Sequence, residues 1–404
     1  MRSTTIAKRS CPICGDTEIE ALHHINFTLP DHSPLPGEYD IVACEACGFV
    51  YADTPAKQPE YDRYYYEHSK YGDPTVATGG SQDDFDRARI EEQADRIAAE
   101  VSKDERILDI GCASGGLLLA LRDRGYRFLE GVDGAPACIE QLAKCGIPAT
   151  LLRLSDLHQS VFDRKFDLVI LSHVLEHVVD LKPLLTAAKS LLAETGRVYI
   201  ETPDASRYDP AMFVPYYFFD CEHINHFDIH NLDTLARAID LHPIASGQTV
   251  LEVAEAMHYP ACWVWLALSE EEGEAKMIER DDEVPLRQSI RKYIADSAAQ
   301  ECYPILAALE KSQEPVIVWG AGSFSQRLFS GSPLARCNVI GIVDKDSNKR
   351  GKTFAGHTVT SPEILLGRHP EATLLVSAAV QFEAIAEEAR KLFPNCNVVS
   401  VRSR

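Results

Sequence analysis

One short segment constrains the fold of this chain more than any other: residues 109–116 read Asp-Ile-Gly-Cys-Ala-Ser-Gly-Gly. Two apolar residues precede it, and the apolar run 117–121 follows it. This pattern predicts a strand, a glycine-rich turn and a helix, and such a turn lets a ligand approach the backbone closely because glycine has no side chain. No Lys-Ser/Thr pair follows the glycines, which excludes a P-loop. The acid at the strand end, Asp109, suits an amino-acid or ribose group better than a pyrophosphate.

Further strand candidates follow at regular intervals, with helical patterns between them. The first ends in Asp133, an acid about 20 residues after the glycines, which is where a nucleotide-binding βαβ unit places its ribose ligand. Alternating strands and helices predict an α/β fold, a doubly wound parallel sheet whose site lies at the carboxyl ends of the strands. The strand candidates are residues 129–133, 149–154, 166–171 and 196–201.

On these motifs, residues 107–204 resemble a class I S-adenosylmethionine-dependent methyltransferase. The order of acids and glycines fits that family better than the G-x-G-x-x-G of a dehydrogenase, which is the alternative nucleotide-binding fold. Ala113 replaces a glycine that the family often has at this place. The resemblance implies that the donor's methionine part is bound by Asp109, Gly111 and Gly115, its ribose by Asp133 and its adenine by Asp156 and Leu157, with Cys112 and His173 as further cofactor-binding residues.

Composition narrows the class of protein. A chain of 404 residues is long enough for two or three domains, and its formal net charge of −21 argues against nucleic acid or an anionic membrane as the main partner. The sequence contains no apolar run long enough to span a membrane and its start lacks the apolar core of a signal peptide. Twelve cysteines in such a chain suggest metal binding and free thiols rather than disulfides, so we expect a cytoplasmic protein.

Four of these cysteines form two C-x-x-C pairs near the N-terminus, Cys11 with Cys14 and Cys44 with Cys47. Each pair brings two thiolates to one side of a tight turn, which is half of a tetrahedral zinc site. We therefore predict one structural zinc ion held by four cysteines, with no open position for chemistry. The alternative is a redox C-x-x-C, which would be single and would precede a helix.

A second constellation lies after the fifth strand candidate, where an aromatic segment over residues 215–227 contains Glu222 and His223. A histidine beside a glutamate in an aromatic pocket is a candidate general base because its pKa lies near neutrality. The alternative is a histidine with a structural hydrogen bond. A tyrosine-rich linker over residues 61–71 is equally open to two interpretations, a packed linker or a flap over the substrate.

The whole chain is similar to the sugar C-methyltransferases that act on nucleotide-linked keto-sugars, which combine an N-terminal zinc module, a methyltransferase core and a Rossmann-like C-terminal domain. The resemblance implies that His223 removes the proton next to the ketone, that Glu222 orients it, and that His177 stabilises the enolate. A linker tyrosine would contribute, and Tyr65, Tyr66 and Tyr71 all compete for that role.

Two residues depart from that family: Asp220 and His226 stand where it often has tyrosines. Both fall in the expected active site, so the identity of the substrate and the choice of carbon as the acceptor stay open.

The C-terminal part carries a second strand, glycine turn and helix pattern over residues 316–325, and a strand candidate ends in Asp344. Ser325 stands where a third glycine would be, so the dinucleotide signal is weak. Three interpretations remain. The domain binds NAD, or it has a nucleotide-binding type of fold without a cofactor. The resemblance to the family implies the third, that it holds the nucleotide end of the substrate. We expect four parts: a zinc module with its linker (1–78), a methyltransferase core (79–264), a helical linker (265–312) and a Rossmann-like domain (313–404).

The sequence therefore predicts methyl transfer from S-adenosylmethionine to a nucleotide-linked keto-sugar by a monomer or homodimer, with carbon as the acceptor. The alternatives are an oxygen or nitrogen acceptor on a sugar or small natural product, an NAD-dependent enzyme that uses the C-terminal domain, and a non-catalytic zinc-ribbon scaffold. Intact Asp109 and Asp133 argue against the scaffold.

Overall fold

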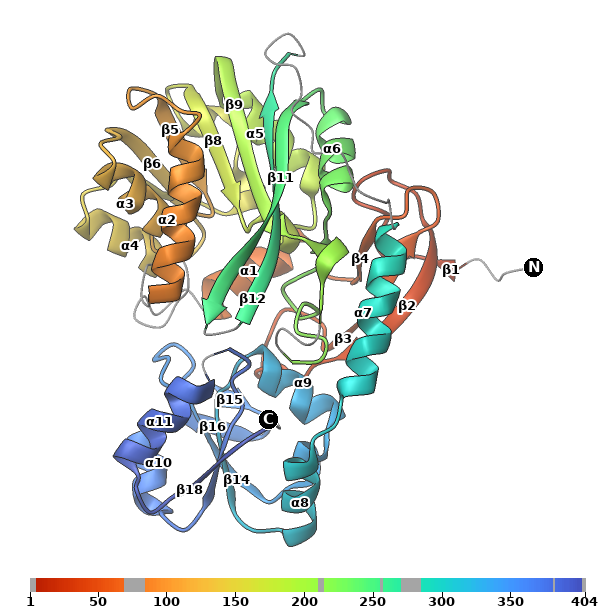
Figure 1. Cartoon of the computed structure of the whole chain (residues 1–404), viewed down its shortest axis with the longest axis vertical. Coiled ribbons are helices and arrows are strands. Elements are labelled where there is room, and N and C mark those ends of the chain that lie inside the picture. Colours follow the sequence, from red (N-terminus) through yellow and green to blue (C-terminus); the bar gives the residue numbers. More distant parts are fainter. Residues whose placement is uncertain are drawn as a thin grey trace. The chain divides into compact units, whose positions relative to one another are not determined.

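The central sheet of the chain has seven strands in the order β11-β12-β9-β8-β5-β6-β7 (Figure 1). A computed structural model describes residues 5–68, 84–209, 214–254, 257–269, 285–380 and 382–401. The strands of this sheet are β5 (Arg106–Ile110), β6 (Phe128–Asp133), β7 (Ala149–Leu151), β8 (Phe166–Ser172), β9 (Leu192–Pro203), β11 (His242–Ala254) and β12 (Met257–Ala267).

The first five of these strands confirm the predicted parallel sheet. β5 pairs in parallel with both β6 and β8, β6 with β7, and β8 with β9. The remaining two strands depart from the predicted parallel arrangement, because β12 runs antiparallel to both β9 and β11. The strand order reverses at β5, so the crevice beyond the carboxyl ends of β5 and its neighbours is where an open α/β sheet binds its ligand.

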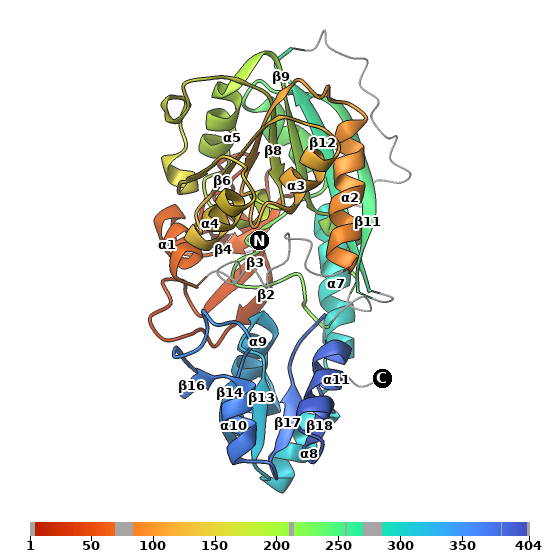
Figure 2. The same cartoon turned by 90° about the vertical axis from the view of Figure 1, so that its left-hand side faces the viewer.

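Helices cover both faces of the sheet; α2 and α5 lie on opposite sides of it (Figure 2). On one face, apolar side chains of α2 and α3, among them Ile97 and Leu118, form a core with Leu168 and Ile170 of the sheet. The helices and short 3-10 turns of this region are α2 (Asp84–Ala98), α3 (Gly116–Asp123), α4 (Pro136–Lys144), η2 (Leu154–Asp156), η3 (Gln159–Val161), η4 (Leu175–His177), α5 (Leu181–Ser190), η5 (Ala205–Arg207) and α6 (Ile229–Arg237).

A separate five-stranded sheet carries the cysteine pairs and has the order β1-β2-β3-β4-β10. Its last strand, β10, lies far along the sequence and pairs antiparallel with β4 through Asn225 opposite Tyr51 and His226 opposite Val50. The segment that carries the predicted Glu-His pair is thus attached to the cysteine module. The elements are β1 (Thr5–Ile6), β2 (Glu18–Asn26), β3 (Glu38–Cys44), β4 (Val50–Asp53), α1 (Gln58–His68) and β10 (Asn225–His226).

The C-terminal part has its own six-stranded sheet, in the order β15-β16-β14-β13-β17-β18. β13 pairs in parallel with β14 and with β17, which agrees with a second Rossmann-like arrangement. Its elements, with the two helices that precede it, are α7 (Leu286–Gln300), α8 (Pro304–Ser312), β13 (Val316–Trp319), α9 (Ser323–Gly331), η8 (Pro333–Arg336), β14 (Val339–Val343), β15 (Thr353–Phe354), β16 (His357–Thr360), α10 (Pro362–Arg368), β17 (Thr373–Val376), α11 (Phe382–Leu392) and β18 (Asn397–Ser400).

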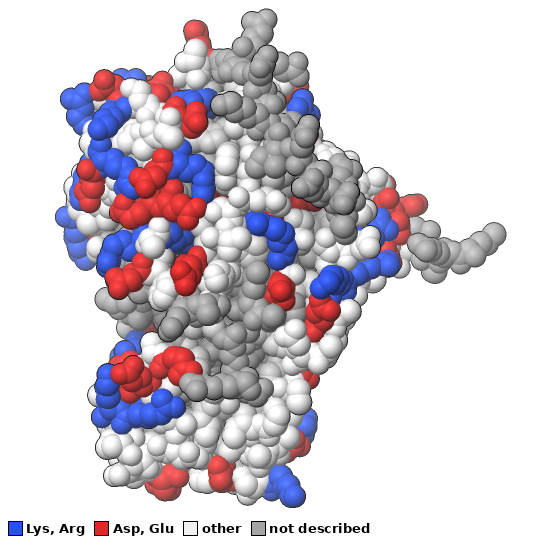
Figure 3. All heavy atoms as spheres, in the orientation of Figure 1, with Lys and Arg blue, Asp and Glu red and all other residues white. Residues whose placement is uncertain are grey.

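The chain divides into two compact units. Unit 1 contains residues 1–22, 40–208 and 222–291, and unit 2 contains residues 23–39, 209–221 and 292–404. All of the described residues considered below as donor-binding, catalytic or metal-binding belong to unit 1. Within the described part of the chain, no helix is both long and apolar enough to cross a bilayer. Acidic and basic side chains are interspersed over the face of α2 that Figure 3 displays, although the net charge of the chain is strongly negative.

Candidate active site

The glycine turn between β5 and α3 needs its glycines for backbone conformation and packing. Gly111 and Gly115 have φ angles of 76° and 82°, in the left-handed region that side chains disfavour. A Cβ at Gly115 would lie 2.2 Å from a methyl carbon of Leu142, and one at Gly111 would lie 2.6 Å from Val174. Ala113 also adopts a positive φ, 46°, so this departure from the family motif keeps a backbone shape that glycine would adopt more easily.

Asp133 holds this turn in place from the end of β6. Its carboxylate accepts hydrogen bonds from the backbone N–H groups of Ala113, at 2.9 Å, and Ala135, at 2.8 Å. Asp109 lies buried at the end of β5. Burial, and then the negative charge of Asp133, raises the pKa of the Asp109 carboxyl to about 8. A buried carboxyl of this kind gains most from a cationic ligand, such as the ammonium of an amino acid.

The residues expected at the adenine lie beyond the end of β7. Asp156 is exposed at the end of η2, and Leu157, the next residue, is buried. Cys112 is buried in the glycine turn, where its N–H bonds to the carbonyl of Val132 at 3.1 Å. These positions agree with a donor site along the β5, β6 and β7 edge, but the individual binding roles stay predictions.

His173 is held between two buried carboxylates directly after β8. Its Nδ1 lies 3.3 Å from Glu176 Oε1, and its Nε2 lies 3.5 Å from Glu201 Oε1. Burial alone would lower the pKa of His173, but the two carboxylates outweigh burial and raise it to about 9. Glu201 also accepts hydrogen bonds from Arg96 Nη1 at 2.6 Å and from the Tyr199 hydroxyl at 2.5 Å. His173 was predicted to bind the cofactor, and that role stays a prediction. Both nitrogens of its ring face carboxylates of the protein.

Glu176 faces two more histidines, and these are the ones that the sequence predicted. Donor and acceptor atoms of Glu176, His177 and His223 all lie within 4.8 Å of one another, a group that could also hold a metal ion. The imidazole rings of His177 and His223 have centroids 4.8 Å apart, in an edge-to-face arrangement. Burial would raise the pKa of Glu176, but the hydrogen bond from His173 and the nearby His177 lower it to about 2. The two imidazoles therefore share the field of one ionised carboxylate.

Glu222 contributes to this group through its backbone and its side chain. Its carbonyl oxygen lies 3.0 Å from His177 Nδ1, and its carboxylate accepts a hydrogen bond from the Tyr64 hydroxyl at 3.3 Å. The proposal that Glu222 orients His223 stays a prediction.

The tyrosines of α1 differ in where they lie. Tyr65 packs edge-on against His177, with ring centroids 5.7 Å apart. Tyr66 is 54% exposed and lines a surface pocket of about 390 Å³ with Glu60 and Arg63. Tyr71, the other tyrosine predicted to act, lies outside the described residues. Of the three competing tyrosines, Tyr65 is the one that the described contacts bring to the histidine pair.

The two departures from the family motif belong to different units. His226 is fully buried in β10, where its ring meets Tyr208 edge-on, with centroids 5.9 Å apart. Asp220 belongs to unit 2, and its carbonyl accepts a hydrogen bond from the Tyr39 hydroxyl at 2.5 Å.

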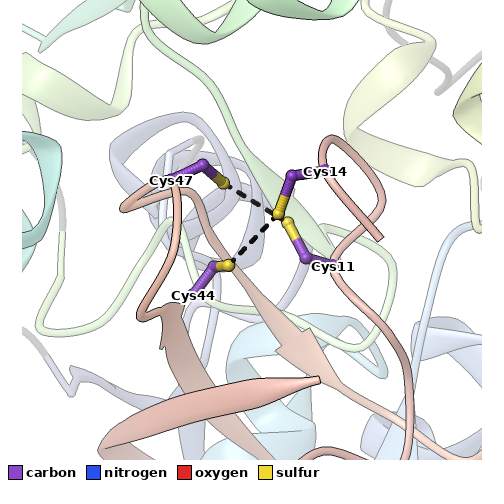
Figure 4. A group of neighbouring side chains, drawn as sticks. All are labelled: Cys11, Cys14, Cys44 and Cys47. Carbon is purple, nitrogen blue, oxygen red and sulfur yellow. Dashed lines mark hydrogen bonds between the residues drawn. The ribbon is translucent and has the colours of Figure 1, made fainter. Parts of the chain in front are cut away.

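The four predicted cysteines come together in a cluster (Figure 4). The Sγ atoms of Cys11 and Cys47 are 3.6 Å apart, and those of Cys14 and Cys44 are 3.5 Å apart. In a tetrahedral zinc site each thiolate sulfur lies about 2.3 Å from the metal, so two of these sulfurs lie about 4 Å apart or slightly less. The cluster therefore has the ligand type, number and spacing that zinc requires, and a redox pair would not assemble four thiols.

An acidic side chain holds the glycine turn of unit 2 in the same way as Asp133 holds the glycine turn between β5 and α3. Asp344, at the end of β14, accepts a hydrogen bond from the N–H of Ala321 at 2.8 Å, as Asp133 does from Ala113. It also pairs with Lys349 at 3.1 Å. Ser325, which replaces the third glycine, donates to the carbonyl of Gly320 at 2.6 Å.

Several residues of the site were missed by sequence reasoning. Glu176 stands directly before His177, so its place beside a predicted histidine was a signal that could have been used. Glu201 and Arg96 carried no such signal, because their roles depend on partners that are distant in sequence.

Comparison with known proteins identifies the core. Residues 83–246 match a family model described as a methyltransferase domain. These residues are a class I S-adenosylmethionine-dependent methyltransferase domain. The methyltransferase domain contains the glycine turn and its acids, both predicted histidines and Glu176. The predicted S-adenosylmethionine-dependent methyltransferase core is thereby confirmed, whereas the match does not address the acceptor.

Relatives with curated names cover a smaller part of the chain. Ubiquinone biosynthesis O-methyltransferases of two Neisseria meningitidis strains, serogroup C (strain 053442) and serogroup A / serotype 4A (strain DSM 15465 / Z2491), are each 29% identical over 105 residues, 24% of this chain. The chain spans 44% of the length of these relatives.

Solved structures resemble the chain over about half of its length. A methyltransferase of Archaeoglobus fulgidus described as S-adenosylmethionine-dependent covers 45% of this chain and 94% of its own, at 16% identity and a TM-score of 0.38. The 1,6-didemethyltoxoflavin-N1-methyltransferase of Burkholderia thailandensis, solved with S-adenosylhomocysteine, covers 55% and 96%, at 18% identity and a TM-score of 0.39.

Proposed function

We propose that the chain transfers a methyl group from S-adenosylmethionine to a carbon atom of a nucleotide-linked keto-sugar, through an enolate. The observation that carries this proposal is the pair of imidazoles, His177 and His223, whose ring centroids are 4.8 Å apart beside the ionised Glu176. Methylation at carbon needs a base to remove a proton and a donor to stabilise the enolate oxygen, and two adjacent histidines supply both.

The donor site fits S-adenosylmethionine in its chemistry. The buried carboxyl of Asp109 suits the α-ammonium of the donor, and Asp133 lies where an acid meets ribose hydroxyls. The bound donor supplies an electrophilic methyl group on a sulfonium centre. The protein's part is to bind and orient it with Asp109, Gly111, Gly115 and Asp133, and Asp156 with Leu157 would contact its adenine.

His177 is suited to stabilise the enolate. Its Nδ1 faces the carbonyl of Glu222, so that nitrogen carries a proton, and its Nε2 lies 3.9 Å from Glu176 Oε1. In the imidazolium form of His177, the Nε2–H beside this carboxylate can donate to an enolate oxygen. His223 is then the base that takes the proton next to the ketone, with Glu222 beside it.

The proposal is tested by solvent exchange. A nucleoside-diphosphate-linked keto-deoxyhexose is incubated with the full chain and S-adenosylhomocysteine in deuterium oxide, and deuterium at the carbon next to the ketone is measured. We expect exchange in the wild type, none in His223→Asn with S-adenosylhomocysteine binding intact, and undiminished exchange in His230→Asn, an exposed control on α6. Exchange that survives in His223→Asn would show that the base assignment is wrong.

A second candidate is methylation of oxygen or nitrogen on a sugar or small natural product. It is favoured by the curated relatives, which are named as O-methyltransferases. This reaction abstracts no proton from carbon, so methylation without deuterium exchange would support it against the carbon acceptor. An NAD-dependent function of unit 2 predicts tight binding of NAD, which a titration beside S-adenosylhomocysteine measures directly.

We further propose that the cysteine cluster holds one structural zinc ion. Four thiolates fill a tetrahedral shell, so this metal stabilises the module and leaves no position for substrate. The division into residues 1–78, 79–264, 265–312 and 313–404 remains our proposal for the functional parts of the chain.

A further inference from the structure

Arg9 is buried in unit 1, although it lies close to the N-terminus and two residues before Cys11. Its guanidinium donates to three backbone carbonyls. Nη2 lies 2.8 Å from the oxygen of Val179 and 3.3 Å from that of Val178, and Nη1 lies 3.4 Å from that of Ile224.

These carbonyls belong to the two segments that carry the histidine pair. Val178 directly follows His177, and Ile224 directly follows His223. One planar guanidinium therefore bonds to the backbone one residue beyond each imidazole. Its donors are fixed relative to one another, so it sets the separation of the two segments, which the flexible ammonium of a lysine would not do.

The two segments are also bonded to each other. The side-chain amide of Asn225 donates to the carbonyls of Leu175 and Val178, both at 2.7 Å, and the N–H of Ile224 donates to the carbonyl of Glu176 at 2.8 Å. A displacement of either segment is thus transmitted to the other, and Arg9 is a buried side chain that joins both segments to the cysteine module.

The backbone of Arg9 is fixed by that module. Its N–H donates to Asp53 at 2.8 Å, and its carbonyl accepts a hydrogen bond from the Tyr51 hydroxyl at 3.1 Å. The guanidinium carbon lies 5.7 Å from the centre of the Tyr51 ring. Tyr51 and Asp53 both belong to β4, the strand that pairs with β10 just after His223.

We propose that Arg9 is a positioning residue for the reaction: it fixes the distance between His177 and His223 and connects that distance to the cysteine module. The catalytic roles of the two histidines rest on the proposed function, whereas the positioning itself does not. Because a misplacement of about 1 Å can reduce turnover by about 100-fold, we expect Arg9 to affect the rate through the positions of the two histidines.

The test uses two substitutions in the zinc-loaded full chain. Arg9→Lys keeps the charge and loses the planar fork. Arg207→Lys is the matched control, since Arg207 also donates to two carbonyls of unit 1, those of Thr249 at 2.7 Å and Ala261 at 2.9 Å, which lie on β11 and β12. The first measurement is the set of imidazole NMR signals with S-adenosylhomocysteine bound, in which those of His177 and His223 are identified by their loss in single substitutions.

We expect Arg9→Lys to move the signals of His177 and His223, and Arg207→Lys to leave them unchanged, while zinc content and S-adenosylhomocysteine affinity stay at their wild-type values in both. Unmoved signals in Arg9→Lys overturn the proposal. Loss of zinc or of S-adenosylhomocysteine binding together with the signal changes also overturns it, because Arg9 would then be a general structural residue.

A second variant covers the case in which the lysine side chain restores the contact. Arg9→Ala leaves a cavity that free guanidinium can enter, and we expect added guanidinium, but not added ammonium at the same ionic strength, to return the two histidine signals to their wild-type positions. No recovery overturns the proposal. If the signals respond but no keto-sugar is methylated, the positioning role stands and the proposed function fails, so the two results are distinguished.

Discussion

The Nδ1 atom of His177 lies 3.0 Å from the backbone carbonyl oxygen of Glu222. A carbonyl oxygen only accepts hydrogen bonds, so Nδ1 must carry the proton, and the lone pair of a neutral His177 resides on Nε2. This bond therefore joins the two segments that carry the catalytic candidates and also fixes the tautomer of one of them.

We expect nitrogen NMR of the free protein to find the Nδ1–H tautomer in the neutral form of His177, and Nδ1–H and Nε2–H together in its imidazolium. The exposed His230 serves as the reference for an imidazole without this constraint. A neutral His177 that carries its proton on Nε2 alone would contradict the hydrogen bond from Nδ1 to the carbonyl of Glu222.

His173 makes the stability of the chain depend on pH. The pKa of His173 is about 9 in the folded protein and about 6.5 in an unfolded chain, so its stabilisation is complete below about pH 6.5 and is lost as the pH rises through about 9. The ion pairs with Glu176 and Glu201 are responsible.

Urea unfolding of the wild type and His173→Asn checks this. The free energy of unfolding should differ most near pH 6, and the difference should shrink by up to about 3 kcal/mol by pH 9. A difference that does not vary with pH in this window would show that His173 is neutral when folded.

We predict that the Asp109 carboxyl releases its proton when S-adenosylhomocysteine binds in the proposed donor site. Burial, and next the charge of Asp133, raises the pKa of Asp109 to about 8, so most of this carboxyl is protonated at pH 7. An ammonium group placed beside it favours the carboxylate, and the proton leaves. Calorimetry of S-adenosylhomocysteine binding in buffers of different ionisation enthalpy should detect up to about one proton released at pH 7 and almost none at pH 9.

Asp109→Asn is the control for this release and should abolish it. We also expect the wild type to bind S-adenosylhomocysteine more tightly as the pH rises from 6 to 8. If the wild type releases no proton at pH 7, Asp109 is either ionised before binding or far from the ammonium.

Ala113 tests the strain in the glycine turn. Its φ of 46° costs an L residue about 1–2 kcal/mol of stability, a cost that glycine avoids. Glycine in turn lowers the stability by about 0.4–1 kcal/mol, because it gives the unfolded chain more conformational freedom. Ala113→Gly should therefore stabilise the chain by at most about 1.5 kcal/mol, while Ala143→Gly, at an exposed position in α4, should destabilise it by about 1 kcal/mol. Destabilisation by Ala113→Gly would contradict the strain at this position.

Particular residues show how far the sequence could predict this molecule. The glycines, Asp109 and Asp133 are local signals whose spacing follows from strand and turn geometry, and the structure confirmed the strands around them. The antiparallel β12 was missed because its residues, buried on both faces, lack the alternation that marks a half-exposed strand. Arg9 and Glu201 could not be found, since a charged residue reveals its role only through partners that lie far along the chain.

Metal removal tests the connection between the cysteine cluster and the histidine pair. Zinc would hold Cys11 and Cys47 together, and Arg9 and β4 connect this module to the segment of His223. Without the metal, no metal–sulfur bonds hold the four sulfur atoms together, so the turns of the module open and β4 loses part of its support. The effect should therefore spread to β10 before it reaches the sheet around β5.

Hydrogen exchange before and after treatment with a chelator and a reductant measures this. The amide of Ala52 bonds the module to the Glu-His segment, and the amide of Ile224 bonds that segment to Glu176. We expect both amides to exchange faster and the amide of Leu108 in β5 to exchange at an unchanged rate. S-adenosylhomocysteine should still bind, because the proposed donor site lies along β5, β6 and β7. Unchanged exchange at Ile224 after complete loss of zinc would show that the histidine segment is held independently of the metal.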